Sequence, residues 1–409
     1  MASSLFTSLK NRGFAWSLRL LIFSLPFNVG VLIYESPWGR GFTNPYTSIF
    51  LSAFDILLLI TLVFFLFRPK KKSLLLHNDR NFLILLAAIA ISCLSQLWAL
   101  HQDANFSLLL CVKLLELLAF YAALHHSSKP QKILYVFILT MCIQSMFALW
   151  QFTAQHDLGL QMLGESQFSS TVANVARFQL GSIDLIRAYG TFPHPNILGG
   201  FLLVSILCTF TLPANFKGEK YALIALQVLA LLTTFSRSAL LALLIVFALM
   251  PGKKKYWKLL PLALGAGLIF ALRGAVFERL EGYEFAYSIL QNQPLGLGFA
   301  QFTTAMDSVS TVALMPWDYQ PVHNIYLLLL TEWGIPAFLI FTVLTVLNFK
   351  KPKFSQAFLK LALIGLLITG LFDHYLVSLE QGRLLLVFVF ALQALKTGGF
   401  LNKTSADPK

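Results

Sequence analysis

The sequence predicts an all-α, polytopic membrane protein with about twelve transmembrane helices and two long outer loops. Hydrophobic residues make up 57% of the 409 residues, and charged residues make up 12%. An average soluble domain carries about 25% charged residues, so roughly half the expected charge is present. The hydrophobic residues also form runs of membrane-spanning length, and short basic or polar clusters separate these runs. A soluble fold of this size could not solvate itself with such a composition.

Twelve hydrophobic runs are expected to span the membrane, and they make the whole chain, residues 1–409, a single integral-membrane domain. The first run is interpreted as a retained helix and not as a cleaved signal peptide. It contains Arg19 and Asn28, and no small-residue cleavage site follows it. The expected spans are 15–33, 47–67, 81–99, 106–124, 132–153, 196–213, 221–236, 238–250, 258–272, 323–349, 355–372 and 383–396.

Basic clusters mark every second connection between these spans. Cytoplasmic loops of membrane proteins are enriched in Lys and Arg. These connections and both termini are therefore expected in the cytoplasm, which places the long loops 154–195 and 273–322 on the outer side. The basic clusters are residues 68–72, 125–132, 216–220, 252–258 and 349–353.

On the outer side of this topology, all the positively charged residues are arginines and none is a lysine. Nineteen of the twenty lysines map to the cytoplasmic side, and Lys113 lies within a span. Topology alone would deplete both residue types, whereas recognition of phosphate or carboxylate favours the planar, permanently charged guanidinium. Pairing with nearby carboxylates such as Glu278 or Glu281 is the structural alternative for any one arginine. The outer arginines are Arg40, Arg177, Arg187, Arg237, Arg273, Arg279 and Arg383.

The two long outer loops are expected to be ordered. Connections of more than about 15 residues without secondary structure are usually functional or disordered. Aromatic residues occur throughout both loops, which argues against disorder. We expect these loops to fold back over the bundle as interfacial helices and to cover a cavity.

Two motifs place an arginine near the outer face of the membrane. The stretch RAYGTFPHPNILGG, residues 187–200, leads into a predicted span. Asn196 is expected to cap the helix of that span, a role that does not explain Arg187 or His194. In TFSRSALL, Arg237 joins two unusually short spans, so this hairpin apex is expected below the outer surface. A recessed arginine without an adjacent acid indicates a functional site.

The second outer loop contains PLGLG, in which Gly296 and Gly298 permit a tight turn. A turn is the simpler interpretation of these glycines, and close approach by a ligand is the functional one. Turn chemistry does not explain Arg279, which lies fifteen residues upstream of Pro294.

The stretch PVHNIYLLLLTEWG places His323 and Asn324 at the outer end of the next span. A lone histidine at a helix start is more often a surface residue than a catalytic one. Glu332 lies nine residues further on, about two and a half helical turns, so it faces away from His323. Glu332 is therefore expected to order helix packing or a kink at Gly334.

The clear intramembrane charges are few. Asp55 and the pair Lys113 and Glu116, three apart on one helix face, are interpreted as packing pairs. The four cysteines all lie inside hydrophobic runs without metal-ligand spacing, and they are interpreted as small buried hydrophobes.

Four motifs occur in order at membrane positions, and together they resemble the O-antigen ligase and O-antigen polymerase family of bacterial membrane glycosyltransferases. The resemblance covers residues 187–349 directly, and the twelve-span layout extends it to the whole chain. The motifs are R-x-x-G-x-x-x-x-P-N (187–196), S-R-S (236–238), P-L-G-L-G-x-x-x-F (294–302) and H-N-x-Y-x-x-x-x-x-E-x-G (323–334).

This resemblance implies transfer of a glycan from an undecaprenyl-diphosphate carrier to an acceptor hydroxyl at the outer face of the bacterial cytoplasmic (inner) membrane. It implies a role in cell-envelope polysaccharide or lipopolysaccharide biosynthesis, with no cofactor and no metal. The partners would be the lipid-linked donor, a glycan, lipid or protein acceptor and the bilayer, without nucleic acid.

The resemblance also assigns roles to residues. Arg187, Arg237 and Arg279 would bind the diphosphate, and His323 would deprotonate or orient the acceptor, with inversion at the anomeric carbon. Fixed guanidinium groups suit this task, because charge builds on the diphosphate as the glycosidic bond breaks. No outer acidic cluster offers a magnesium site, so arginines would replace the metal. The supporting positions would be Asn196, Asn324, Gly296, Gly298 and Glu332.

Other interpretations remain open at this point. The motifs do not distinguish a ligase from a polymerase, and they do not identify the acceptor. A lipid-linked glycan flippase or another transporter is the second hypothesis, and it predicts charges at the bilayer midplane and a repeat between the two halves. A non-catalytic assembly subunit is the third hypothesis, but it leaves the segregation of arginine from lysine unexplained.

Overall fold

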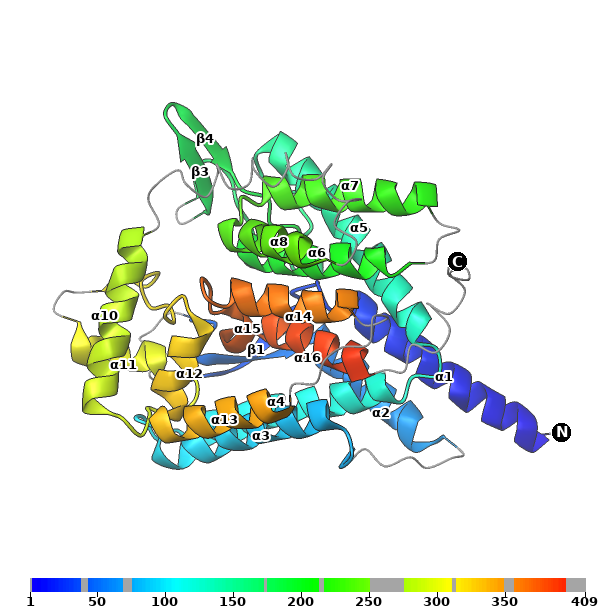
Figure 1. The fold of residues 1–409 in the computed structure, drawn as a ribbon, viewed down its shortest axis with the longest axis horizontal. Coiled ribbons are helices and arrows are strands. Elements are labelled where there is room, and N and C mark those ends of the chain that lie inside the picture. The colour runs from blue at the N-terminus through cyan, green and yellow to red at the C-terminus, as the bar shows by residue number, and fades with distance from the viewer. Residues whose placement is uncertain are drawn as a thin grey trace, which may run out of the picture.

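The computed structural model describes residues 2–37, 43–68, 76–172, 175–212, 217–250, 276–310, 314–348 and 357–394. This part of the chain is mostly helical, and most of its helices run along the long axis of the molecule (Figure 1). The helices of the first half are α1 (Ala2–Ser24), α2 (Ala53–Leu66), α3 (Arg80–Leu94), α4 (Ala104–His125), α5 (Pro130–Ala154), α6 (Pro195–Phe210), α7 (Lys217–Thr233) and α8 (Arg237–Leu249). Those of the second half are α10 (Val276–Asn292), α11 (Phe302–Val309), α12 (Ile325–Trp333), α13 (Ile335–Asn348), α14 (Ala357–Thr369), α15 (Tyr375–Ser378) and α16 (Glu380–Ala394).

Three helical segments are long and apolar enough to cross a membrane: Arg80–Trp98, Ala104–His125 and Pro130–Ala154. The first of them combines α3 with the 3₁₀ turn η2 (Ser95–Trp98). Further helices, such as α6, α8 and α14, are apolar but shorter. The chain is therefore a mostly helical, membrane-associated protein.

The helices pack in layers around α6. Every residue of α6 is buried except Asn196. On one side of it, α14 contacts both α6 and α8, and α16 continues the packing onto α3 and α4 (Figure 1). A single hydrophobic core joins these layers. A helix that is apolar all round is stable only when it is buried in this way.

The helices agree in position with the predicted spans. Each predicted span in the described part of the chain overlaps at least one helix, and the predicted span 258–272 lies outside the described residues. The predicted span 323–349 is divided into α12 and α13 at Gly334, which has a φ of 84°.

The structure is mostly helical, as the all-α prediction requires, but the described chain also contains two β-hairpins that the prediction did not include. The helix expected to reach residue 33 ends at Ser24, and β1 (Gly30–Glu35) pairs antiparallel with β2 (Ser48–Ser52). Pro26 follows the end of α1, and a helix rarely continues up to a proline. The valine, isoleucine and tyrosine of β1 favour a strand, and they are as hydrophobic as the residues of a helix would be.

The segment 154–195, predicted as an outer loop of interfacial helices, also differs from its prediction. In place of interfacial helices it contains a 3₁₀ turn, η3 (Gln161–Leu163), and a hairpin of β3 (Arg177–Leu180) and β4 (Ile183–Ile186). The loop 273–322 does contain helices, namely α10 and α11.

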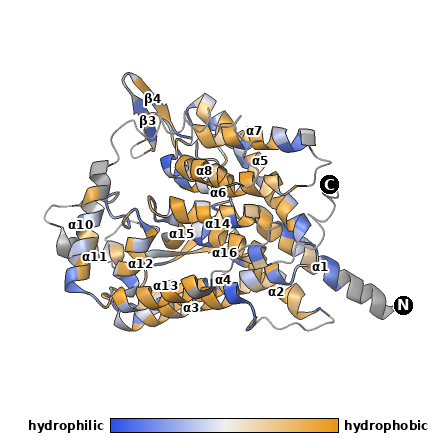
Figure 2. Ribbon diagram, in the orientation of Figure 1, coloured by the Kyte–Doolittle hydropathy of each residue, from blue (hydrophilic) through white to orange (hydrophobic). Residues whose placement is uncertain are grey.

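The ends of the bundle differ from its middle in composition. The β3–β4 hairpin, α10 and α11 lie at one end, whereas α1 begins and α16 ends at the other (Figure 1). Hydrophobic residues dominate the helices along the long axis, and hydrophilic residues gather on the β3–β4 hairpin and on α10 (Figure 2). This division is typical of a bundle whose middle faces lipid and whose ends face water.

Candidate functional site

A polar cavity of about 390 Å³ lies among chain turns that are far apart in sequence. His194 precedes α6, His323 precedes α12, and Asp373 and His374 join α14 to α15. Three of the chain's eight histidines therefore line one cavity. Other residues of its wall include Asn28, Tyr46, Lys113, Gln320, Ser378, Glu380 and Arg383.

His323 lies one residue before the N-cap of α12. The cap is Asn324, whose Oδ1 accepts the backbone N–H groups of Tyr326 at 2.9 Å and Leu327 at 3.0 Å. The backbone N–H of Ile325 donates to the carbonyl of Gly370 at 2.8 Å, which ties the start of α12 to the end of α14. His323 is half-buried, and capping does not account for it.

The imidazole of His323 contacts that of His374 edge-on, with ring centroids 4.9 Å apart. Nδ1 of His374 lies 2.7 Å from Oγ of Ser378, and Tyr46 packs against its ring at a centroid distance of 5.4 Å. His374 is 4% exposed, so its position is fixed on several sides.

Asp373 is the carboxylate of this group, and it is 5% exposed. Its Oδ1 accepts the backbone N–H of His374 at 2.8 Å, and its Oδ2 accepts Nδ2 of Asn196 at 2.6 Å. Both carboxylate oxygens are therefore hydrogen-bonded, which a buried charge requires.

Asn196 does not cap α6, contrary to the sequence-based expectation. The N-cap is His194, whose Nδ1 accepts the backbone N–H of Asn196 at 3.1 Å. Pro195 takes the first helical position, where its missing N–H costs nothing, and the cap therefore lies two residues earlier than expected. The side chain of Asn196 instead joins Asp373 to an arginine, because its Oδ1 accepts Nη2 of Arg187 at 2.5 Å.

Arg187 is held from two sides. Its Nη2 donates to Asn196, and its Nε donates to the carbonyl of Thr234 at 2.7 Å. Thr234 lies in the turn between α7 and α8, three residues before Arg237, which is the first residue of α8. The structure thus connects Arg187, Asn196 and Asp373 by hydrogen bonds and places Arg237 after the adjoining turn.

A close approach of two helices brings these turns together. A Cβ added to Gly200 of α6 would lie 1.9 Å from the hydroxyl of Tyr375, the residue that begins α15. Only glycine permits this contact, which brings the start of α6 next to the turn that carries Asp373 and His374.

Burial determines the protonation state of two of the cavity histidines. Burial, followed by the charge of the neighbouring Arg187, lowers the pKa of His194 to about 3. Burial also lowers the pKa of His374 to about 3, with His323 as the next cause. Both imidazoles are therefore neutral at pH 7 and can accept hydrogen bonds or a proton.

Asp373 stays ionised in the same surroundings. Burial alone would raise its pKa, but the adjacent His374, His323 and His194 and the amide of Asn196 lower it overall. A carboxylate beside neutral imidazoles can stabilise an imidazolium that forms when one of them takes a proton.

Arg279 lies in α10, and its side chain is outside the described part of the chain. The helix itself lies near the cavity, since a Cβ added to Gly282 would lie 3.7 Å from Val322, the residue before His323.

Gly296, Gly298 and Glu332 form a separate group at the other end of α12. Gly296 and Gly298 both have a φ of 92°, and a Cβ on Gly296 would lie 2.4 Å from the backbone nitrogen of Gly334. The backbone N–H of Gly298 donates to the carbonyl of Glu332 at 3.0 Å. The carboxylate of Glu332 accepts the backbone N–H of Phe302 at 3.3 Å. These contacts pack the PLGLG segment against the break between α12 and α13.

The wall of the cavity also contains a charged network. Lys113 of α4 hydrogen-bonds to Asp55 of α2, and its Nζ lies 3.3 Å from Glu380 of α16 and 3.8 Å from Glu116. The packing pair expected from the sequence is therefore one part of a network that joins three helices.

The arginines predicted on the outer side do not share one role. Nη1 of Arg177 pairs with Asp184 across the β3–β4 hairpin at 2.8 Å, as the carboxylate-pairing alternative predicts. Nη1 of Arg383 donates to the carbonyl of Val377 at 3.0 Å and to that of Ser378 at 3.3 Å. Arg40 and Arg273 lie outside the described residues.

Sequence reasoning missed Asp373, His374 and Tyr46 as cavity residues. The available signal was FDHY, residues 372–375, in which three polar or titratable residues follow a hydrophobic run. In the segments that the structure describes, no group of three or more His, Cys, Asp or Glu side chains is arranged to hold a metal ion.

The comparisons with known proteins do not identify a family for this bundle and its cavity. No family model matches the chain, and the searches of curated proteins and of solved structures gave no significant match.

Proposed function

We propose that this protein is a membrane glycosyltransferase of the O-antigen ligase or polymerase type. It takes a glycan from an undecaprenyl-diphosphate carrier and transfers it to an acceptor hydroxyl at the outer face of the bacterial cytoplasmic membrane. One observation carries the proposal: His323 shares a cavity with His374 and Asp373, and Asp373 is joined through Asn196 to Arg187.

In the proposed reaction His323 is the general base. It removes the proton of the acceptor hydroxyl as the oxygen forms a bond to the anomeric carbon of the donor. The bond from that carbon to the diphosphate breaks, and its electron pair leaves with the diphosphate. A single displacement of this kind inverts the anomeric centre. Asp373 stabilises the imidazolium that His323 becomes, because its carboxylate lies among the cavity histidines.

The arginines act on the leaving group. Two protein groups already orient the guanidinium of Arg187, so it needs no rearrangement when charge develops on the diphosphate. Arg237 and Arg279 complete the diphosphate site in this proposal. The acceptor is a glycan, a lipid or a protein, and the cavity favours neither the ligase nor the polymerase branch.

The test is transfer of a labelled undecaprenyl-diphosphate glycan by purified protein in liposomes, without nucleotide or ion gradient. Product should form and should persist in EDTA. Arg237→Lys should impair transfer, because lysine loses the bidentate fork. The matched control is Arg177→Lys, which changes an arginine that is ion-paired within the outer hairpin. Absence of product would contradict the proposal. Loss of transfer in EDTA that a divalent ion restores would contradict its metal-independent form.

Transport is the second candidate function, and the network around Lys113 favours it. Ionisable residues inside membrane helices commonly mark ion or substrate pathways. The same liposomes decide between the two candidates. Gradient-dependent movement of the unaltered lipid-linked glycan, without product, would identify a transporter.

A further inference from the structure

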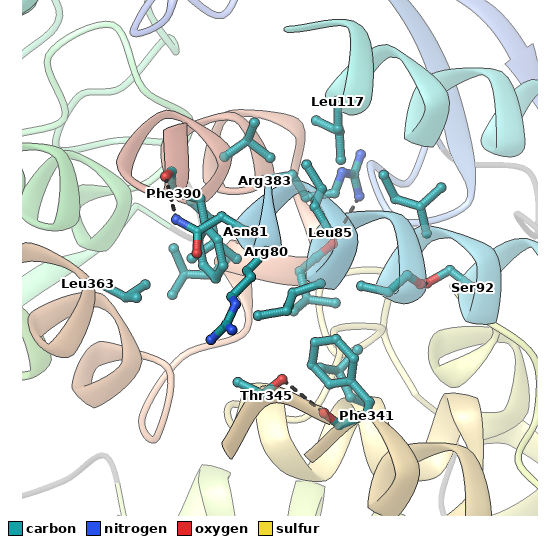
Figure 3. Close-up of a pocket in the computed structure, with 18 of the residues that line it drawn as sticks. Arg80, Asn81, Leu85, Ser92, Leu117, Phe341, Thr345, Leu363, Arg383 and Phe390 are labelled. Carbon is teal, nitrogen blue, oxygen red and sulfur yellow. Dashed lines mark hydrogen bonds between the residues drawn. The ribbon is translucent and has the colours of Figure 1, made fainter. Parts of the chain in front are cut away.

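A second and larger cavity lies on the side of the bundle, between α3, α13, α14 and α16. This lateral groove has a volume of about 1020 Å³, and most of its lining residues are apolar. Figure 3 shows side chains of these helices around it, including Leu85, Phe341 and Leu363. On α3 the groove extends from Arg80 to Ser92, twelve residues or roughly 18 Å at 1.5 Å per residue.

This length fits one leaflet of a bilayer. The hydrocarbon core is about 30 Å thick, so each leaflet contributes about 15 Å. The serine and threonine hydroxyl groups that line the groove are hydrogen-bonded within their own helices: for example, Ser92 donates to the carbonyl of Ala88, and Thr345 to that of Phe341. The wall of the groove therefore presents hydrocarbon to whatever occupies it.

The cation at one end of the groove is Arg80, the first residue of α3. It is exposed, and its side chain makes no hydrogen bond or ion pair within the described ranges. In Figure 3 its guanidinium lies between Leu363 of α14 and Thr345 of α13. The nearby amide of Asn81 is occupied, because it donates to the carbonyl of Phe390 at 3.1 Å.

The other charged groups of this lining do not neutralise Arg80. Asp79 caps α3 and accepts the hydroxyl of Tyr121 at 3.0 Å, and its carboxylate also lies 3.1 Å from Nδ1 of His125. Of the remaining titratable groups, His77, Lys360 and Arg383 are basic, and the hydroxyl of Tyr326 donates to the carbonyl of Leu367 at 2.9 Å. The carboxylate of Asp79 is thus engaged by other groups, and the lining as a whole contains more basic than acidic side chains.

We infer that this groove binds an anionic glycerophospholipid, with the acyl chains between α3, α13 and α14 and the phosphate on Arg80. Basic pockets between membrane helices at the cytoplasmic side are suited to anionic lipid head groups. The end of the groove at Arg80 is the end at which α1 begins and α16 finishes (Figure 1), opposite to α10 and α11. The diphosphate donor of the proposed reaction would carry its head group at the end with α10, which leaves Arg80 to a different lipid.

The test measures lipid retained by the purified full-length protein, by native mass spectrometry after release from nanodiscs. The probes are phosphatidylglycerol and phosphatidylcholine with the same acyl chains. Phosphatidylglycerol should be retained preferentially, and Arg80→Gln should weaken its retention roughly tenfold, the loss of one charge-assisted hydrogen-bonding group. Arg80→Lys, which keeps the charge, should retain most of it. The matched control is Arg12→Gln, at an exposed arginine of α1 that does not line the groove.

A second pair of variants tests the acyl-chain part of the site. Ala88→Trp would fill the groove and should remove the bound lipid, whereas Leu86→Trp, on the outward face of the same helix, should not. Equal retention of the two phospholipids, or unchanged phosphatidylglycerol retention in Arg80→Gln, would overturn the inference. Displacement of phosphatidylglycerol by undecaprenyl phosphate would overturn it in favour of a carrier-lipid site. The measurement needs no transfer activity, so its outcome is independent of the proposed function.

Discussion

At the scale of single residues, the adjacent His323 and Asn324 have different roles, helix capping and contact in the cavity, which the sequence alone could not assign between them. Asn324 caps α12 through two backbone N–H groups, and the imidazole of His323 instead contacts His374 in the cavity. A capping histidine would tolerate replacement by asparagine, which caps helices well. A general base would not tolerate it. The two roles therefore predict different outcomes for the same substitution.

We expect His323→Asn to bind the lipid-linked donor almost normally and to lose transfer by about 10²–10⁴-fold, the usual contribution of a general base. Donor binding and glycan transfer should be measured on the same preparation. His156→Asn is the matched control, since His156 is an exposed histidine of the outer loop that does not line the cavity. Full transfer activity in His323→Asn would remove His323 from the mechanism.

His374 gives a prediction about pH. Its pKa falls from the model-compound value of 6.5 to about 3 in the folded protein, chiefly through burial. Between these values the unfolded chain binds a proton that the folded chain does not. The stabilisation is thus complete above pH 6.5 and is lost as pH falls toward 3, by about 1.4 kcal/mol per pH unit. His374→Gln should reduce this dependence in thermal unfolding between pH 7.5 and 5. An identical pH dependence in both proteins would contradict the prediction.

At the scale of elements, hydrophobic run length predicted where helices lie but not where strands replace them. The segments Gly30–Glu35 and Ser48–Ser52 consist largely of hydrophobic residues, so hydropathy alone did not separate β1 and β2 from the neighbouring helices. The informative signals were local ones, namely Pro26 after α1 and the β-branched residues of β1. The break in the span 323–349 had a stronger signal, because Gly334 and Pro336 both interrupt a helix.

Gly296 tests the packing of the PLGLG segment against that break. Its φ of 92° disfavours any side chain, and a Cβ there would meet the backbone of Gly334 and Glu332. We expect Gly296→Ala to lower the free energy of unfolding by roughly 1–3 kcal/mol, measured by thermal unfolding in detergent. Gly218→Ala is the control, because no atom lies within 4 Å of its added Cβ. Equal stability of the two variants would show that the segment adapts to a side chain.

At the scale of the whole molecule, the site is assembled from turns that only the order of helix packing brings together. His194, His323 and Asp373 precede or follow different helices, and nothing in their spacing predicts that these turns meet. His323 and Arg187 were predicted as site residues from their motifs and from the resemblance of those motifs to the O-antigen ligase and polymerase family, and their roles stay predictions. Sequence reasoning passed over His374, since a short turn between two hydrophobic runs carries no such signal.

The orientation of the whole bundle is the prediction on which the proposed site depends. Exposed Met162 lies in the outer loop, and exposed His77 precedes α3 at the opposite end. With the native cysteines replaced, a membrane-impermeant maleimide added to intact cells should label Met162→Cys and should spare His77→Cys until the cells are opened. Lys255→Cys, in a basic cluster outside the described residues, should behave as His77→Cys does. If His77→Cys and Lys255→Cys were labelled from outside and Met162→Cys were protected, the cavity with His323 would face the cytoplasm. An outer-face transfer reaction could not then occur in it.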